Sequence, residues 1–199
     1  MDKTTRHKFI YPLPSTKQDD IIDAVQKFSS DINTNSKLIR TDFDRKLIGA
    51  KVTKCLNKKN TKIEAAPTHL QNQNALCERN WRSILRMTRS WLASALLPSK
   101  FWSHALKHAT KVGNYIRIRI NNILTTPHEL AFHNKVDLRT LLPLFSVAYT
   151  SYNNGNNSLN SNSCRAILIG RSTKTHAFEF YVLCRKWRDK GSNLTVRDC

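Results

Sequence analysis

The segment from Trp81 to Leu96 has the most regular hydrophobic pattern of the chain. Apolar residues recur there at steps of three and four, which is the spacing of one face of an α-helix. Pro98 predicts the end of this helix, because proline lacks the amide donor that a helix interior needs. We expect the following residues of this face to lie in a core: Trp81, Ile84, Leu85, Thr88, Trp91, Leu92, Ala95 and Leu96.

Four arginines occupy roughly the opposite side of the same predicted helix. At about 100° per residue they fall within one narrow stripe, and Glu78 lies at its border. Such a row of guanidinium groups is suited to the phosphates of a nucleic acid. We call it the arginine stripe, and its members are Arg79, Arg82, Arg86 and Arg89.

A second helix is predicted directly after Pro98, with Ser99 as its N-cap. Its apolar face consists of Phe101, Trp102, Ala105, Ala109, Val112 and Ile116. Another face carries His104 and three lysines that we also predict to bind nucleic acid, namely Lys100, Lys107 and Lys111. No acidic residue occurs from Arg79 through His128, so both helices are expected to present positive surfaces.

The charge of the whole chain supports a polyanionic partner. The 199 residues include 33 Lys and Arg against 14 Asp and Glu, which gives a formal net charge of +19. A hydrophobic content of 40% excludes a wholly disordered basic tail, so the charge is expected on the surface of a folded protein. Nucleic acid is the first candidate partner.

Several classes of protein are excluded by the same sequence. No apolar run is long enough to span a bilayer or to follow the basic first residues as a signal peptide does, so we expect a nuclear or cytoplasmic protein that is not secreted. The cysteines are scattered without a C-x-x-C pair, which predicts reduced thiols and no cysteine-based zinc site. They are Cys55, Cys77, Cys164, Cys184 and Cys199.

The remaining patterns predict strands that alternate with helices, which is typical of an α/β fold. Strands are expected at 8–13, 37–41 and 61–66, with helices at about 19–29 and around 52–56. Residues 153–163 have the composition of an Asn/Ser linker. Strands at 166–169 and 178–183 are predicted to form a hairpin that leads into a basic run, Arg185, Lys186, Trp187 and Arg188. This run suits phosphate contact and base stacking, although a solvated strand end is an equally good interpretation.

Two acidic residues are candidates for metal-dependent chemistry. Asp42 follows a predicted strand, Glu78 lies on the predicted helix, and 35 residues separate them. Carboxylates that hold Mg²⁺ or Mn²⁺ can promote phosphoryl transfer. The alternative interpretation is a solvated Asp42 and a Glu78 that pairs with Arg82. His104 and His108 are weaker metal candidates, because no Glu between them completes an H-E-x-x-H motif.

The order of the motifs resembles the second half of the integrase core of Copia-type retrotransposons. The likeness rests on Ile39-Arg40-Thr41-Asp42, Asn72-Gln73-Asn74 before Glu78-Arg79, Leu97 to Trp102, Thr126 to Leu130, Phe145 to Tyr149, Ile167 to Ser172 and Phe178 to Tyr181. That family is known for an Asp, Asp, 35-residue, Glu triad. The resemblance covers nearly the whole chain.

The resemblance implies an α/β fold, namely a truncated RNase H-like integrase core with following helices and a small C-terminal β hairpin segment. It implies that Asp42 and Glu78 are the catalytic and metal-binding residues, that the partners are retroelement ends and target DNA rather than a membrane, and that copies of the chain form a homo-oligomer. It also implies an origin in a polyprotein. The expected regions are a core-like region at 1–128, an irregular segment at 129–152, the linker at 153–163 and a small basic β segment at 164–199.

The chain departs from the family pattern at two points. Phe43 and Asp44 follow Asp42 where the family has Asn-Gly, and neither the first catalytic Asp nor the zinc module has a counterpart in this sequence. Two carboxylates fix two metal ions poorly, so we expect weak metal binding and no integrase activity. The missing first strands of the family's sheet would leave apolar faces and strand edges uncovered, which predicts marginal stability or aggregation. The alternatives are a non-catalytic basic DNA- or RNA-binding protein and a gene-model fragment of a longer polyprotein.

Overall fold

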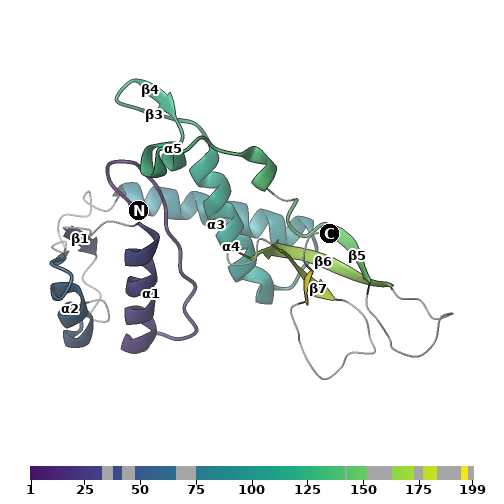
Figure 1. The fold of residues 1–199 in the computed structure, drawn as a ribbon, viewed down its shortest axis with the longest axis horizontal. Helices are drawn as coiled ribbons and strands as arrows, with labels where there is room; N and C mark the ends of the chain where they lie inside the picture. Colours follow the sequence, from purple (N-terminus) through teal and green to yellow (C-terminus); the bar gives the residue numbers. More distant parts are fainter. Residues whose placement is uncertain are drawn as a thin grey trace. The chain divides into compact units, whose positions relative to one another are not determined.

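The structure is a computed structural model that describes residues 1–32, 38–41, 48–65, 75–141, 143–151, 163–172, 177–182 and 194–196. Within these ranges helices and strands are mixed (Figure 1), which confirms the predicted α/β class. The chain divides into two compact units, an N-terminal unit (Met1–Leu85) and a C-terminal unit (Arg86–Cys199).

The described part of the N-terminal unit contains two complete helices, the first part of a third and a two-stranded parallel sheet. Its elements are α1 (Gln18–Asp31), β1 (Leu38–Thr41), α2 (Ala50–Asn57) and β2 (Lys62–Ala65). In this sheet Ile39 pairs with Ile63, and both pack against a core cluster of Ile21, Val52 and Leu56. The helices and the two strands predicted in this region are therefore confirmed.

Residues 8–13 do not form the predicted strand. Aromatic and β-branched residues favour extended backbone, but a strand also needs a neighbour to pair with, and Pro12 lacks an amide donor. The segment instead packs through Phe9, whose ring lies edge-on to Phe28 of α1 at 5.2 Å between centroids.

The helix predicted around residues 81–96 is α3 (Ala75–Ser94), and the division between the two units falls within it. In the C-terminal unit Trp91 and Leu92 of this helix, with Ala95 just after its end, pack against a buried cluster, as the periodicity predicts. Two expected core residues are exposed instead. Leu96 is 92% exposed and has a φ of 52°, because the chain turns after the last helical residue. Trp81, at 45% exposed, lies on the N-terminal half of α3, where the described residues do not cover it.

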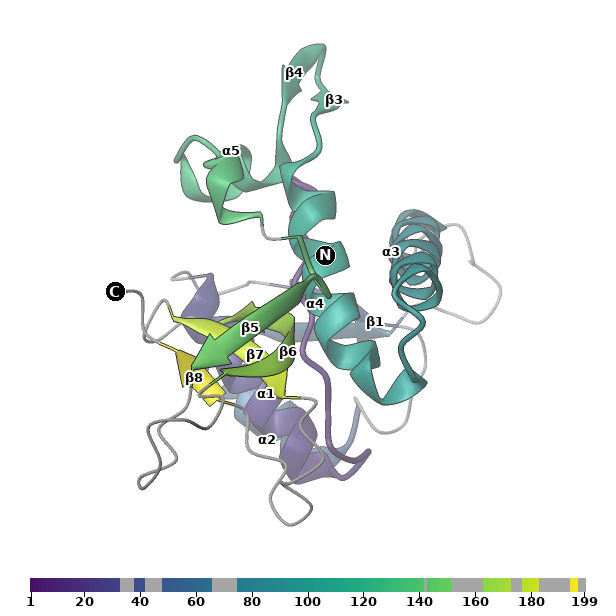
Figure 2. The same cartoon turned by 90° about the vertical axis from the view of Figure 1, so that its right-hand side faces the viewer.

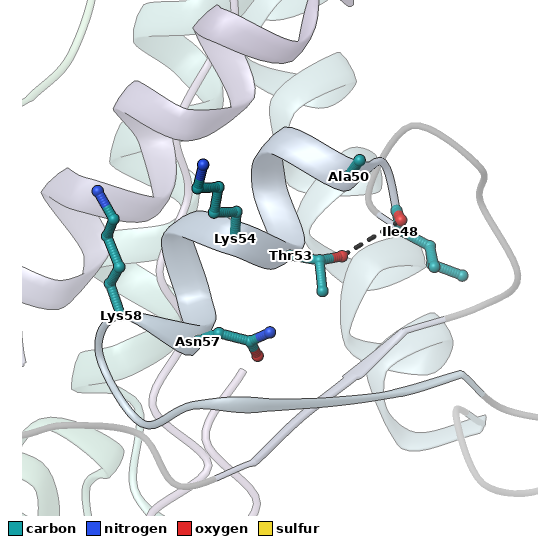
Figure 3. A pocket seen from close by; sticks show the side chains of 6 residues that line it. All are labelled: Ile48, Ala50, Thr53, Lys54, Asn57 and Lys58. Atoms are coloured by element: carbon teal, nitrogen blue, oxygen red, sulfur yellow. Dashed lines mark hydrogen bonds between the residues drawn. The ribbon is translucent and has the colours of Figure 1, made fainter.

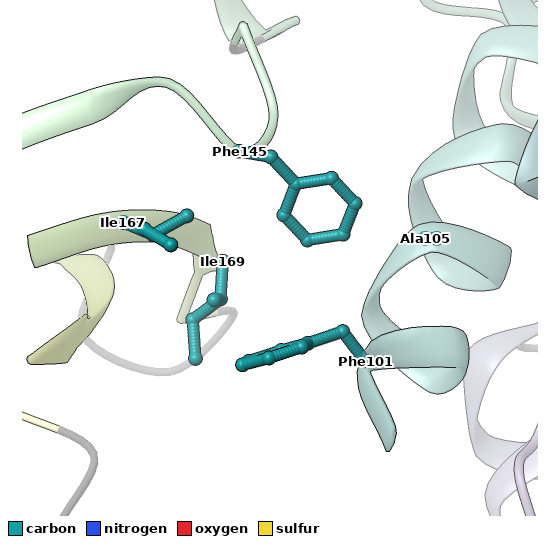
Figure 4. Close-up of a cluster of buried hydrophobic side chains, with 5 residues drawn as sticks. All are labelled: Phe101, Ala105, Phe145, Ile167 and Ile169. Carbon is teal, nitrogen blue, oxygen red and sulfur yellow. The ribbon is translucent and has the colours of Figure 1, made fainter. Parts of the chain in front are cut away.

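The second predicted helix begins with a 3-10 turn, η2 (Ser99–Phe101), and continues as α4 (Trp102–Tyr115). Ser99 is the first residue of the 3-10 turn and not a capping residue, so that expectation is wrong. Phe101 and Ala105 are buried against the C-terminal sheet (Figure 4), while Trp102 and Ile116 are about half exposed. The face was predicted too wide, because the described residues leave its two outer members, Trp102 and Ile116, about half exposed.

The C-terminal sheet has the strand order β5-β6-β7-β8 and is antiparallel throughout. Its strands are β5 (Val147–Ser151), β6 (Ser163–Arg171), β7 (Phe178–Val182) and β8 (Leu194–Val196). Pairing of β6 with β7 confirms the predicted hairpin. Strand β5 was not predicted, since its segment was expected to be irregular; pairing with β6 is what makes it a strand. The predicted linker lies outside the described residues except for Ser163, which begins β6.

Between α4 and this sheet the chain forms a short ribbon and helix. Strands β3 (Ile118–Ile120) and β4 (Ile123–Thr125) pair across a turn, followed by α5 (Pro127–Phe132) and a 3-10 turn, η3 (Leu138–Thr140). Figures 1 and 2 both show the ribbon extending beyond the end of α4. The sequence analysis did not predict it.

The described cysteines differ in oxidation state. Cys55 and Cys77 are free thiols, as predicted. Cys164, which is 5% exposed on β6, is disulfide-bonded, so the expectation of reduced thiols is wrong at this position. Spacing along a sequence does not reveal which cysteines a sheet brings within bonding distance.

No helix in the described ranges combines the length and the apolar character that a membrane span requires.

Candidate nucleic-acid interface

The arginine stripe lies on the exposed side of α3. Arg79, Arg82, Arg86 and Arg89 are all exposed, whereas Ile84 and Thr88 on the other side of the helix are 4% and 5% exposed. One continuous helix thus presents four guanidinium groups to solvent.

The stripe makes few contacts that compete with a ligand. Arg82 pairs with Glu78 across one helical turn, with 3.8 Å between Nη2 and Oε2 and with both side chains more than half exposed. Such an exposed pair contributes at most about 0.5 kcal/mol. The Arg79 side chain donates to the Ala75 carbonyl oxygen, and in the described part of the chain Arg86 and Arg89 have no ion pair.

Two of the three candidate lysines of α4 and its leading 3-10 turn are engaged within the C-terminal unit. The Lys100 ammonium group donates to the Tyr181 hydroxyl group at 3.0 Å and lies 4.7 Å from the centre of that ring. The Lys111 ammonium group donates to the Thr140 carbonyl oxygen at 2.9 Å. Burial, followed by repulsion from Arg171, lowers the pKa of Lys111. These contacts fix α4 against its neighbours.

Lys107 is exposed and has no hydrogen bond or ion pair within the described ranges, so it is the lysine of this set that faces solvent freely. Arg185, Lys186 and Arg188 lie outside the described residues. The described part of the predicted nucleic-acid surface is therefore mainly the arginine stripe.

The acidic candidates do not form a metal site in the part of the chain that the structure describes. Asp42 lies outside that part, so its distance from Glu78 stays a prediction. Glu78 is exposed and its carboxylate faces Arg82. The described residues contain no group of three His, Cys, Asp or Glu side chains that could hold a metal ion. On their own they do not fit Mg²⁺ or Mn²⁺, and we derive no reaction step through such an ion.

The two histidines of α4 point to different neighbours. His104 forms a hydrogen bond with the backbone of Ile169 on β6, and the His108 ring lies 5.0 Å from the Trp91 ring of α3. Burial lowers the pKa of both imidazoles, helped by Lys107 beside His104 and Lys111 beside His108. Both histidines have packing roles.

An open hollow lies beside α2 in the N-terminal unit (Figure 3). Its lining residues are Ile48, Ala50, Thr53, Lys54, Asn57 and Lys58. The Thr53 hydroxyl group donates to the Ile48 carbonyl oxygen at 3.3 Å, so it is not free to act on a ligand. The lining contains no carboxylate, thiol or imidazole, so it offers no acid–base pair for catalysis.

The sequence analysis did not single out the exposed arginines of the β3–β4 ribbon, Arg117 and Arg119. A signal was present: alternating isoleucine and arginine at 116–120 precede Asn121 and Asn122, Ile123 and Leu124 follow them, and asparagine tolerates the positive φ of a tight hairpin turn.

Comparison with known proteins adds the following. No family model matches the chain. The Transposon Ty1-PR2 Gag-Pol polyprotein of Saccharomyces cerevisiae (strain ATCC 204508 / S288c) is 23% identical over 186 residues, which cover 91% of this chain. The chain resembles the integrase region of an LTR-retrotransposon polyprotein. The predicted resemblance is thereby confirmed, and this integrase-like chain spans 10% of the length of that relative.

Two solved structures were also found for this integrase-like chain. The catalytic core domain of BIV integrase is 12% identical, with a TM-score of 0.49, over 61% of this chain and 74% of that one. A chain of the simian T-cell lymphotropic virus intasome in complex with PP2A regulatory subunit B56 gamma is 16% identical, with a TM-score of 0.49, over 79% of this chain and 59% of that one.

Proposed function

We propose that this chain is part of a Copia-type retrotransposon integrase and that it binds DNA through the arginine stripe of α3. The observation that carries the proposal is the row of four exposed arginines, of which only Arg82 forms an ion pair with another described residue. Similarity to a Gag-Pol polyprotein supports the retroelement origin.

The length of the stripe suits a nucleic acid backbone. At 1.5 Å per residue, Arg79 and Arg89 are separated by about 15 Å along the helix axis. Duplex DNA carries about one negative charge per 1.7 Å of its axis, so a stripe of this length lies beside several phosphates. Sequence-independent phosphate binding is the chemistry that such a surface supports.

Salt dependence of binding tests the proposal. Each phosphate contact releases condensed counterions, so log K falls with log[salt] by about 0.9 per contact. The double variant Arg82→Gln with Arg86→Gln should make this slope shallower by about 1.8. Between about 50 and 200 mM salt, the wild type should then lose roughly tenfold more affinity than the variant does.

A matched variant controls for overall charge. Lys17→Gln with Lys27→Gln lowers the formal net charge of +19 by the same two units at exposed positions of α1 and its N-cap. For this control variant, the slope of log K against log[salt] should stay close to that of the wild type. Equal slopes for the wild type and the α3 variant, measured by fluorescence anisotropy on one duplex, would rule out the arginine stripe as the site.

Metal-dependent strand joining is the second candidate function, favoured by the resemblance of Asp42 and Glu78 to family acids. We expect no joining of retroelement-end duplexes by this chain with Mg²⁺ or Mn²⁺, because the resemblance matches only two carboxylates of the triad. Glu78→Gln is the decisive variant, since it removes a negative charge beside the stripe and should leave DNA binding intact. Joining by the wild type that disappears in Glu78→Gln would contradict the expected inactivity and assign Glu78 to catalysis.

The remaining expectations from the sequence analysis also stay proposals. They are binding of retroelement ends and target DNA, assembly with further copies of the chain, a nuclear or cytoplasmic location, and the region boundaries at 128, 152 and 163.

A further inference from the structure

The β3–β4 ribbon exposes basic and aliphatic side chains together. Ile123 and Leu124 are 65% and 59% exposed, and Ile116 just before the ribbon is 51% exposed. Arg117 and Arg119 are exposed as well, and neither forms an ion pair within the described residues. This apolar exposure lies outside the core cluster of the C-terminal unit.

The ribbon is firmly shaped although its strands have three residues each. A hairpin of this size is at best marginally stable alone. Here Asn121 and Asn122 adopt φ values of 48° and 64°, as a type I′ hairpin turn requires. The end of the ribbon that leads into α5 is held by a capping box. The Thr126 side chain accepts a hydrogen bond from the Glu129 amide, and the Glu129 carboxylate accepts one from the Thr126 amide.

The Glu129 carboxylate holds this end of the ribbon through two further hydrogen bonds. It accepts hydrogen bonds from the Thr125 hydroxyl group and from the Val136 amide. These bonds, with the one from the Thr126 backbone amide first, lower the pKa of Glu129. The ribbon is thus presented in a defined conformation, and its exposed face is not a product of loose folding.

The exposed arginine and aliphatic side chains of the ribbon suit a partner that carries both negative charges and apolar groups on its surface. No acidic residue occurs from Arg79 through His128, so an anionic partner meets no like-charge repulsion from this segment. Register pairs Arg119 with Leu124, which places a guanidinium group and an aliphatic side chain on one face of the ribbon. The major groove of duplex DNA admits a two-stranded ribbon, offers guanine acceptors to arginine and presents thymine methyl groups to aliphatic side chains.

We propose that the β3–β4 ribbon enters the major groove of duplex DNA with its Arg119 and Leu124 face against the bases and Arg117 against the backbone. This inference rests on the proposed nucleic-acid binding and adds a second contact, with base edges, to the phosphate contact of the arginine stripe.

The test combines salt dependence with chemical footprinting of the full chain on a duplex of mixed sequence. Arg117→Gln with Arg119→Gln should make the slope of log K against log[salt] shallower by about 0.9, because Arg117 is the phosphate contact and Arg119 faces the bases. Dimethyl sulfate methylates guanine N7 in the major groove, and the wild type should protect guanines that the variant leaves reactive. Arg117→Lys with Arg119→Lys keeps both charges and should retain most of the slope. If the double Gln variant does not fold, Arg117→Gln alone should change the slope by about 0.9, and Arg119→Gln alone should remove the guanine protection.

Each outcome supports or contradicts binding of the ribbon in the major groove. An unchanged slope and unchanged guanine protection would overturn the inference, while a flattened slope in the Arg82→Gln, Arg86→Gln variant would leave the proposed function standing. A wild type that does not bind DNA would overturn both. Protection of adenine N3, which lies in the minor groove, would contradict the proposed placement.

The same variants distinguish DNA from two other partners of the ribbon, an anionic membrane and a second copy of the chain. Vesicles of phosphatidylserine and phosphatidylcholine in equal parts test for an anionic membrane surface. Loss of vesicle binding in the Arg117→Gln, Arg119→Gln variant, together with unchanged DNA binding, would assign the ribbon to lipid and overturn the inference. Concentration-dependent self-association that the same variant abolishes, with DNA binding unchanged, would assign it to contact between copies.

Discussion

Phe101→Ala is expected to lower the free energy of unfolding of the C-terminal unit by about 3–5 kcal/mol. Phe101 is 5% exposed and joins the start of α4 to the sheet. Its ring lies edge-on to Tyr181 at 4.9 Å and to Phe145 at 6.3 Å between centroids, and its side chain points toward Ile169 (Figure 4). Truncation removes these contacts and leaves a cavity that the neighbouring strands cannot fill.

Urea unfolding followed by circular dichroism measures the effect. Phe101→Leu keeps most of the volume and should cost less than Phe101→Ala. Leu96→Ala removes an aliphatic side chain that is 92% exposed and should change stability by no more than about 0.5 kcal/mol. A loss under about 1 kcal/mol for Phe101→Ala would mean that this cluster is not the core of the unit.

Leu56→Ala is expected to destabilise the N-terminal unit by about 2–5 kcal/mol. The side chain is 3% exposed and forms a cluster with Ile21 and Val52 under the two-stranded sheet. Among the described residues the cluster has three buried members, with four partly buried aliphatic side chains packed against it, so loss of one member removes a large share of its contacts. A small unit has a total stability of about 5 kcal/mol, and the variant is therefore expected to unfold much of it.

Hydrogen exchange of backbone amides locates this effect. Amides of α1 and α2 should lose protection in Leu56→Ala, while those of β6 and β7 should keep it, because the two clusters share no residue. Leu38→Ala, at a position that is 47% exposed on β1, is the matched control and should leave protection unchanged. Equal loss of protection in both units would show that the chain unfolds as one cooperative body.

Local sequence patterns were enough to predict the main helices and the arginine stripe. The apolar period of α3 fixes which side is buried, and the four arginines then lie opposite because their spacing is set by the same helix geometry. The α1, α2, β1 and β2 segments were predicted for the same reason, since their apolar residues repeat with the period of their own element. The hairpin of β6 and β7 also follows from neighbouring residues.

The tertiary structure decided everything that depends on a distant partner. Lys100 and Lys111 share a pattern with Lys107, but the hydroxyl group of Tyr181 and the carbonyl oxygen of Thr140 engage the first two. Residues 8–13 have strand-forming side chains and find no pairing strand, whereas β5 is a strand because β6 pairs with it. A helical period is written in adjacent residues, while pairing and burial depend on segments that the fold brings together across long stretches of chain.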